Sequence, residues 1–316
     1  MAEVGDVVGR DAADVHPGPP DDRQRTPAQH ERAWGRVEGA AHEPQTRGVR
    51  PALVATDLDG TLLRPDGSVS PRTVDALRAA EDAGVVVVMV TGRPPRWLAP
   101  VAEQVGHTGV AVCANGAVVY DLHAERVLET FAIGREVLLE VVAAVRGAVP
   151  GVSFAVEDVH LGYGREEAYV RRPVAGVPPE DVRVAPLERL VDGHVVKLLV
   201  RHEGMDSDRL LAAAREVAGG LAELTHSSSS GLLEISATGV TKASTLAQLA
   251  AEHGVEAADV VAFGDMPNDL PMLAWAGTAY AMANAHPDVL AAVDHVAPPH
   301  DADGVAVVLE SLLRPE

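Results

Sequence analysis

Residues 52–61 have the sequence ALVATDLDGT, an apolar run followed by two aspartates, a glycine and a threonine. A short apolar run of this kind, ending at Thr56, is typical of a buried strand. Asp57 and Asp59 then leave the sheet together at the carboxyl end of that strand, and Gly60 lets the backbone turn sharply and come close to a ligand. Strands and helices alternate on both sides of this stretch, which predicts an α/β fold with a parallel sheet.

A second acidic cluster, Gly264–Asp269 (GDMPND), also follows an apolar run, Val260–Phe263. Carboxylates gathered at strand ends repel one another unless a cation lies between them. Hard oxygen ligands suit Mg²⁺, and we expect Asp265 to bind it directly. Asn268 and Asp269 would hold metal-bound water or orient a lysine. Either residue also suits a simple helix cap.

The two clusters together indicate phosphoryl transfer through an aspartyl-phosphate. Asp57 would attack phosphorus. Asp59 would protonate the leaving alcohol and then take a proton from the water that hydrolyses the intermediate. The alternatives for this segment are an ordinary Asp-Gly turn and a calcium loop, but Gly60 comes too early for the calcium loop. The catalytic interpretation is favoured because residues further along the chain agree with it.

Thr91, Gly92 and Arg93 follow the β-branched run Val85–Val90, which predicts a buried parallel strand. A threonine between a strand and a helix is often only an N-cap. Beside a phosphate, its hydroxyl and the amides at the helix start also form a seat for the anion. Arg93 is either a surface residue or a contact to phosphate or substrate.

Only two of the 26 lysines and arginines are lysines, Lys197 and Lys242. Lys242 lies at the start of the helix expected over Thr241–His253, where a positive charge is unfavourable for the helix dipole. That cost suggests a role, and an ammonium between Asp57 and a phosphate would offset both negative charges. Lys197 lies in the apolar run His194–Val200, where a structural lysine and a functional one are equally compatible with the sequence.

The composition restricts the class of protein. The chain has 316 residues, of which 47% are hydrophobic and one is cysteine, and its net charge is −20. Such a charge argues against nucleic acid as a partner and requires any phosphate site to be made positive locally. A single cysteine excludes an internal disulfide and indicates a reducing compartment. No apolar stretch is long enough to span a bilayer, so we expect a cytoplasmic protein with no membrane contact.

The pattern divides the chain into three parts. Residues 1–49 lack periodicity, are rich in Pro, Gly and charged residues, and are expected to be disordered. Residues 50–122 and 232–316 show the strand–helix alternation of the core. Residues 123–231 predict an inserted α+β cap, and Ser227–Ser230 is expected to be the flexible connection that returns to the core.

These motifs resemble those of the haloacid dehalogenase-like hydrolase superfamily, in particular the Cof-like phosphatases with a type IIB cap. The resemblance covers about residues 53–313. The first and fourth motifs are the most specific. The matching segments are DLDGTLL (57–63), TGR (91–93), GVTKASTL (239–246) and GDMPNDLPML (264–273), with CANGA (113–117) and MANAHPDV (282–289) as further signatures.

The resemblance implies a Rossmann-like core, Mg²⁺ and hydrolysis of small phosphate monoesters. It implies Asp57 as nucleophile, Asp59 as acid and base, and Thr91 and Lys242 as phosphate binders. The implied metal ligands are Asp57, the Asp59 carbonyl and Asp265, and the further residues lining the site are Asn115 and Asn284. The chain departs from the pattern at Ala243, where glycine is common, and at Leu290, where lysine is frequent.

Two alternatives remain open from the sequence. A phosphomutase would use the same four motifs and return the phosphoryl group to the substrate. A non-catalytic binding or regulatory module would be favoured by loss of Asp57 or Asp59, and both are present. Sugar phosphates, phosphorylated glycolytic acids, pyridoxal phosphate and flavin mononucleotide are all compatible substrates, because the cap carries no motif that selects among them.

Overall fold

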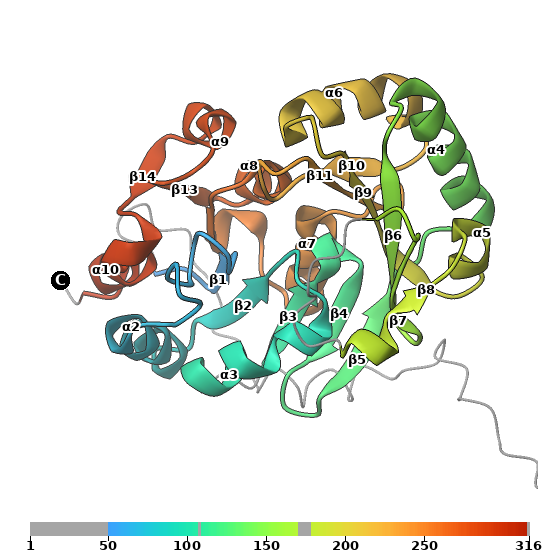
Figure 1. Cartoon of the computed structure of the whole chain (residues 1–316). Helices are drawn as coiled ribbons and strands as arrows, with labels where there is room; N and C mark the ends of the chain where they lie inside the picture. The colour runs from blue at the N-terminus through green and yellow to red at the C-terminus, as the bar shows by residue number, and fades with distance from the viewer. Residues whose placement is uncertain (1–49, 107–108, 170–177, 315–316) are drawn as a thin grey trace, which may run out of the picture.

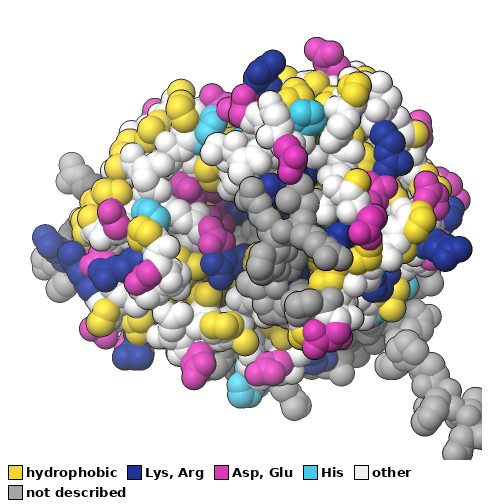
Figure 2. All heavy atoms as spheres, in the orientation of Figure 1, with side chains coloured by type: hydrophobic (Ala, Val, Ile, Leu, Met, Phe, Trp, Pro, Cys, Tyr) yellow, Lys and Arg dark blue, Asp and Glu magenta, His cyan; other side chains and the backbone are white. Residues whose placement is uncertain are grey.

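The computed structural model describes residues 50–106, 109–169 and 178–314, so the expected disorder of residues 1–49 lies outside the described residues. The described residues form an eight-stranded sheet and a six-stranded sheet, each with helices packed on it (Figure 1). On the face drawn in Figure 2, acidic and basic side chains are interspersed. Within the described ranges, no helix is long and apolar enough to cross a membrane.

The larger sheet has the strand order β14-β13-β12-β1-β2-β3-β4-β5. The six strands from β14 to β3 are parallel, and β4 and β5 continue the sheet as antiparallel strands at one edge. The strands are β1 (Leu53–Thr56), β2 (Val86–Val90), β3 (Val110–Cys113), β4 (Val118–Asp121), β5 (Arg126–Thr130), β12 (Val260–Gly264), β13 (Thr278–Met282) and β14 (His295–Ala297). The strand order reverses at β1, because β2 lies on one side of it and β12 on the other. Open α/β sheets bind ligands at such a point, beyond the carboxyl ends of the strands.

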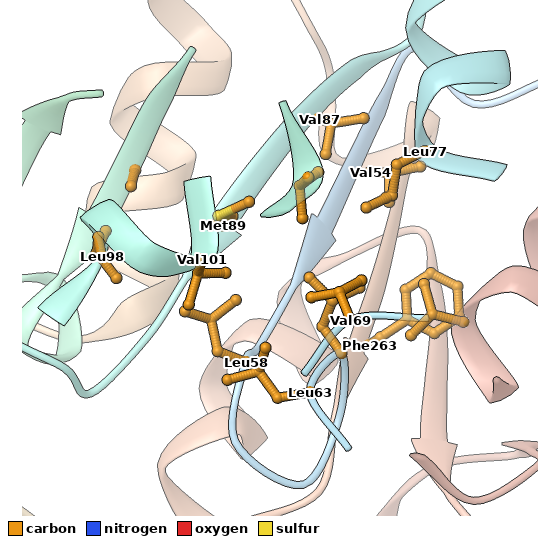
Figure 3. Close-up of a cluster of buried hydrophobic side chains, with 14 of the residues drawn as sticks. Val54, Leu58, Leu63, Val69, Leu77, Val87, Met89, Leu98, Val101 and Phe263 are labelled. Carbon is orange, nitrogen blue, oxygen red and sulfur yellow. The ribbon is translucent and has the colours of Figure 1, made fainter. Parts of the chain in front are cut away.

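Both faces of this sheet are covered by helices, as the continuous apolar runs predict. Val54, Val87 and Met89 pack with helices α2, α3 and α10 on one face (Figure 3). Leu53 and Val88, one residue away along their strands, pack with α7, α8 and α9 on the other face. The helices are α2 (Pro71–Asp82), α3 (Ala99–Val105), α7 (Lys242–Glu252), α8 (Leu270–Trp275), α9 (Pro287–Ala292) and α10 (Gly304–Leu312).

Helix starts follow the local sequence. Ser70 caps α2 by accepting the N–H of Thr73, with Pro71 as the first helical residue. Between β2 and β3 the chain forms a 3₁₀ turn, η1 (Pro95–Trp97), followed by α3. Pro100 lies in the first turn of α3, where its missing N–H costs no helical hydrogen bond.

The smaller sheet has the order β10-β11-β9-β6-β7-β8. Helices α4 and α6 cover one face of it (Figure 1) and enclose a second apolar core. Its strands are β6 (Ser153–Asp158), β7 (Gly162–Arg165), β8 (Arg183–Val184), β9 (Val195–Arg201), β10 (Glu223–Thr225) and β11 (Leu232–Ser236), and its helices are α4 (Arg135–Ala148), α5 (Leu187–Leu190) and α6 (Ser207–Ala218).

Strand pairing differs from the expected domain boundaries at both ends. β5, expected in the cap, pairs with β4 in the larger sheet. β11, expected in the core, pairs with β9 and β10 in the smaller sheet. Ser227–Ser230 therefore connects two strands of the smaller sheet and is not the return to the core. The local pattern of apolar residues predicts that a segment is a strand. Which sheet the strand joins depends on contacts with residues far away in the sequence.

Candidate active site

Four segments meet at the carboxyl edge of the parallel strands. Asp57 follows β1, Thr91 follows β2, Asp265 follows β12, and α7 presents Lys242 as its first residue. All four residues are buried. The parallel register of β1 with β2 and β12 places these strand ends at one edge of the sheet. Residues more than 180 positions apart in the sequence therefore form one polar cluster.

Lys242 is the central charge of this cluster. Its Nζ lies 2.6 Å from Asp57 Oδ1 and 2.5 Å from Asp269 Oδ1. Burial would lower the pKa of the ammonium, but the negative charges of Asp269 and Asp57 outweigh it and raise that pKa. Thr241 and Ser244 form a capping box that satisfies the helix start, so alanine at position 243 leaves the cap intact.

The carboxylates around Lys242 form an oxygen-only cluster, with oxygens of Asp57, Asp265 and Asp269 all within 4.8 Å of one another. Burial is the largest cause raising the pKa of Asp57, and burial raises the pKa of Asp265 to about 7. Thr61 Oγ1 donates to Asp265 Oδ1 at 2.9 Å. A divalent cation between Asp57 and Asp265 would offset both penalties, so these residues fit a hard metal ion.

Asp269 has a different position from the other two acids. Its Oδ1 accepts from Lys242, and its Oδ2 accepts the backbone N–H groups of Asp265 and Met266 at 3.0 and 2.9 Å. Both oxygens are thus engaged by the protein. Asp269 therefore links Lys242 to the backbone of the loop that begins at Asp265.

Gly60 is required by the packing of the two acidic loops. Its φ is +79°, and a Cβ at this position would lie 2.2 Å from Asp265 Oδ2. Asn284 holds the same turn: its Nδ2 donates to the Gly60 carbonyl at 2.8 Å, and its Oδ1 accepts the backbone N–H of His300 at 3.0 Å. Asn284 therefore connects the Asp57–Thr61 loop to the backbone at His300.

Asp59 and Arg93 face each other across the entrance to the site. The guanidinium donates two hydrogen bonds, to Asp59 Oδ2 at 2.7 Å and to Asp59 Oδ1 at 2.6 Å. The Asp59 side chain is 61% exposed, in contrast to that of Asp57. Thr91 Oγ1 accepts the N–H of Arg93, two residues on, at 3.1 Å, which is a turn bond. The expected N-cap role is not seen, because the 3₁₀ turn that follows has Pro94 as its N-cap residue.

Residues of the smaller sheet reach the same place. Lys197 donates to the Gly92 carbonyl and, at 3.0 Å, to Glu234 Oε1. Glu234 Oε2 accepts from Asn115 Nδ2 at 2.8 Å, and Asn115 Oδ1 accepts from Asn268 Nδ2 at 3.1 Å. Asn115 and Asn268 thus lie at the site. Lys197, for which the sequence left a structural and a functional role open, is connected to them through Glu234.

A cavity of about 140 Å³ opens between these groups. Four of the residues that line it were not expected from the sequence. Glu234 had a visible signal, a carboxylate inside the apolar strand Leu232–Ser236; the other three have ordinary local sequences. The lining residues are Asp57, Asp59, Gly92, Arg93, Asn268 and, not expected, Trp97, Ser227, Glu234 and Met266.

Comparison with known proteins agrees with this geometry. The model of the haloacid dehalogenase-like hydrolase family matches residues 54–309. The pyridoxal phosphate phosphatase YbhA of Escherichia coli is 30% identical over 271 residues, which cover 83% of this chain and 98% of the relative. The 5-amino-6-(5-phospho-D-ribitylamino)uracil phosphatase YcsE of Bacillus subtilis is 27% identical, over 80% of this chain and 92% of its own.

Solved structures show the same fold. The protein SMU.1108c of Streptococcus mutans matches with a TM-score of 0.71 at 23% identity, covering 83% of this chain and 99% of its own. The subclass IIB sugar phosphatase BT4131 matches with a TM-score of 0.68 at 22% identity, covering 82% and 98%. The chain belongs to the haloacid dehalogenase-like hydrolase family and is a phosphatase of small phosphorylated metabolites. This family implies a divalent metal, which the acidic cluster fits.

Proposed function

We propose that the chain hydrolyses phosphate monoesters through an aspartyl-phosphate on Asp57, with Mg²⁺ as the metal. The observation that carries the proposal is the position of the Asp57 carboxylate, 2.6 Å from the Lys242 ammonium and inside the cluster with Asp265. A carboxylate in this setting is held for attack on phosphorus, while the cations beside it offset the charge that develops.

The protein groups divide the reaction between them. An oxygen of Asp57 forms a bond to phosphorus as the bond to the leaving alcohol breaks. Asp59 gives the alcohol its proton and later takes one from the water that attacks the acyl-phosphate. In the present geometry both Asp59 oxygens accept from Arg93, so substrate binding has to open that pair. Arg93 is then free to bind the phosphate, beside the hydroxyl of Thr91.

Mg²⁺ fits the oxygen donors of Asp57 and Asp265, with the Asp59 carbonyl as a further ligand. When bound, it would supply positive charge that offsets the charge of the phosphate. Lys242 and Asp269 would keep the Asp57 carboxylate in its reactive orientation.

The substrates that we propose are small and hydroxylated. Glu234, Ser227 and Trp97 line the cavity of about 140 Å³ beside Asp57 and Asp59. A carboxylate and a hydroxyl suit the OH groups of a leaving alcohol. Relatives are named for pyridoxal phosphate and for a phosphorylated ribityl compound, so these belong in a substrate panel with sugar phosphates and phosphoglycolate.

The proposal is tested by replacing the nucleophile. Asp57→Asn keeps the shape of the side chain, and we expect it to abolish Mg²⁺-dependent release of phosphate while circular dichroism and the unfolding midpoint stay close to those of the unchanged protein. A fluoroberyllate adduct should form on Asp57 of the unchanged protein. Measuring free phosphate beside isomerised sugar phosphate separates hydrolysis from mutase activity. Retained turnover in Asp57→Asn would refute the mechanism.

A further inference from the structure

Two histidines and an aspartate come together away from the catalytic carboxylates. Asp208 lies in the first turn of α6, His226 follows β10, and His286 is the N-cap residue of α9. The His226 side chain is 2% exposed and that of His286 is 16% exposed, whereas Asp208 is open to solvent. Such an acid favours the start of α6 through the helix dipole, but the dipole does not account for two imidazoles turned toward it.

The nitrogen and oxygen atoms of these three side chains that could bind a metal lie close together. Nε2 of His226 lies 2.9 Å from Asp208 Oδ1, and Nε2 of His286 lies 3.5 Å from Asp208 Oδ2. One donor atom from each residue can be chosen so that all three lie within 4.8 Å of one another. The two rings are 5.7 Å apart between centroids and inclined at 73°, so they approach from different directions.

We propose that Asp208, His226 and His286 form a binding site for a divalent transition metal of the Zn²⁺ or Co²⁺ type. Tetrahedral coordination with bonds of about 2.0–2.1 Å separates neighbouring ligand atoms by roughly 3.4 Å. The present separations are 2.9 Å from His226 to Asp208 Oδ1 and 3.5 Å from His286 to Asp208 Oδ2, so each imidazole lies near that value from one of the two oxygens of the same carboxylate. Two imidazoles and one carboxylate suit Zn²⁺ or Co²⁺ and leave a fourth position for water, while Mg²⁺ prefers the oxygen-only cluster around Asp57.

A second carboxylate is placed to support this site. Asp288 Oδ2 lies 3.8 Å from Nδ1 of His286, the ring nitrogen that points away from the proposed metal. A metal on Nε2 moves the ring proton to Nδ1, and the usual partner for that proton is a carboxylate in this position. In the metal-free protein Nδ1 instead accepts the N–H of Asp288 at 3.2 Å as the cap of α9. In the metal-bound state the Asp288 carboxylate, now 3.8 Å away, would have to come closer to accept the proton on Nδ1.

The proposed site would join the two parts of the molecule. Asp208 and His226 belong to the smaller sheet and its helix, whereas His286 belongs to the larger domain. The backbone N–H of His286 donates to the carbonyl of Asp265 at 2.8 Å, so the site is anchored directly behind the catalytic loop. A bound ion would hold the cap in its present position and slow the opening that substrate exchange requires.

The test uses Co²⁺ as the probe, on full-length protein that carries no polyhistidine tag. Saturating Mg²⁺ first fills the oxygen-only cluster. Isothermal titration and the visible absorption of Co²⁺ with nitrogen ligands should then show one further ion per chain. We expect Asp208→Asn and His286→Ala to weaken Co²⁺ binding by about 100-fold or more, and Asp288→Asn by about tenfold, the usual effect of losing an outer carboxylate.

The matched control is His123→Ala, since His123 is an exposed histidine in the loop between β4 and β5. It should bind Co²⁺ like the unchanged protein. His226 is not replaced, because a change at this buried side chain could prevent folding. Asp208→Asn alters an exposed side chain instead, so its loss of Co²⁺ binding can be assigned to the site. The proposal is overturned if Mg²⁺-saturated protein binds no Co²⁺, or if Asp208→Asn and His286→Ala leave its affinity unchanged. An equal loss in His123→Ala would also overturn it. Because the readout is binding, it is independent of the phosphatase mechanism.

Discussion

At the scale of single residues, Gly60 allows a close approach between the two acidic loops, and it can be tested against a matched glycine. Gly60 and Gly67 have nearly the same φ, +79° and +80°, but a Cβ at Gly67 meets nothing within 4 Å, whereas at Gly60 it meets Asp265 Oδ2 at 2.2 Å. Replacing either by alanine carries a similar backbone cost of about 1 kcal/mol or somewhat more. Only Gly60→Ala should also displace the Asp265 carboxylate.

We therefore expect Gly60→Ala to weaken activation by Mg²⁺ about tenfold or more, as loss of ligand orientation does at other metal sites. Gly67→Ala should lower the unfolding midpoint by a similar amount and leave the Mg²⁺ dependence of phosphate release unchanged. Titrating activity against Mg²⁺ for both variants measures this. Equal Mg²⁺ dependence in the two variants would show that Asp265 adjusts and that the approach at Gly60 does not limit the site.

At the scale of elements, β9 and β11 contribute a buried ion pair, Lys197 and Glu234, that contacts the larger domain at Gly92 and Asn115. Lys197 and Glu234 lie on the face of the smaller sheet that is not covered by α4 and α6, and both side chains are less than 10% exposed. Burial raises the pKa of Glu234, but the charge of Lys197 and the hydrogen bond from Asn115 outweigh it, so this pKa is lowered. Glu234 is thus an ionised carboxylate in the interior, stabilised by a few specific partners.

Breaking this pair from the lysine side should be costly. Lys197→Met leaves the Glu234 charge buried, which typically costs about 3–5 kcal/mol of unfolding free energy. The double variant Lys197→Met/Glu234→Gln should lose less than Lys197→Met alone, because the amide is neutral and still accepts from Asn115. Denaturant unfolding of these two variants and the unchanged protein measures the difference.

An exposed pair provides the control for that cycle. Arg72 and Glu310 form two hydrogen bonds, but their side chains are 48% and 38% exposed. Surface pairs of this kind contribute little to stability because water screens them, so Arg72→Met should change the unfolding free energy little. If Lys197→Met were as mild as Arg72→Met, the buried network would be too well hydrated to hold the cap on the core.

These elements also show how far the sequence alone leads. The strands, the cap of α2 at Ser70 and the acidic ends of β1 and β12 depend on local apolar pattern and turn chemistry, and all could be predicted. The sheet that β11 joins could not, since Leu233 and Ile235 would alternate in the same way in either sheet. For the same reason the position of Glu234 in the cavity was missed: its neighbours in space, Lys197 and Asn115, are 37 and 119 residues away.

At the scale of the whole molecule, the net charge of −20 opposes the approach of a phosphorylated substrate. The groups that would attract it act at short range: Lys242 is buried between two carboxylates, and Arg93 is engaged by Asp59. Acidic side chains are distributed among basic ones over the face shown in Figure 2, so no single acidic patch on that face accounts for the repulsion. Salt screens such a field, because the Debye length falls from about 30 Å at 0.01 M to about 8 Å at 0.15 M.

We therefore expect kcat/KM for a phosphate monoester to rise a few-fold between about 0.01 and 0.15 M salt, with kcat at saturating substrate nearly unchanged. Buried contacts such as that of Lys242 are screened much less than the surface field, which is why the effect should appear in substrate capture alone. Mg²⁺ is kept saturating throughout, and sucrose at matched osmolality controls for effects other than screening. A fall in kcat/KM with salt would mean that the cations at the site outweigh the net charge, and that the substrate is attracted from a distance despite the acidic surface.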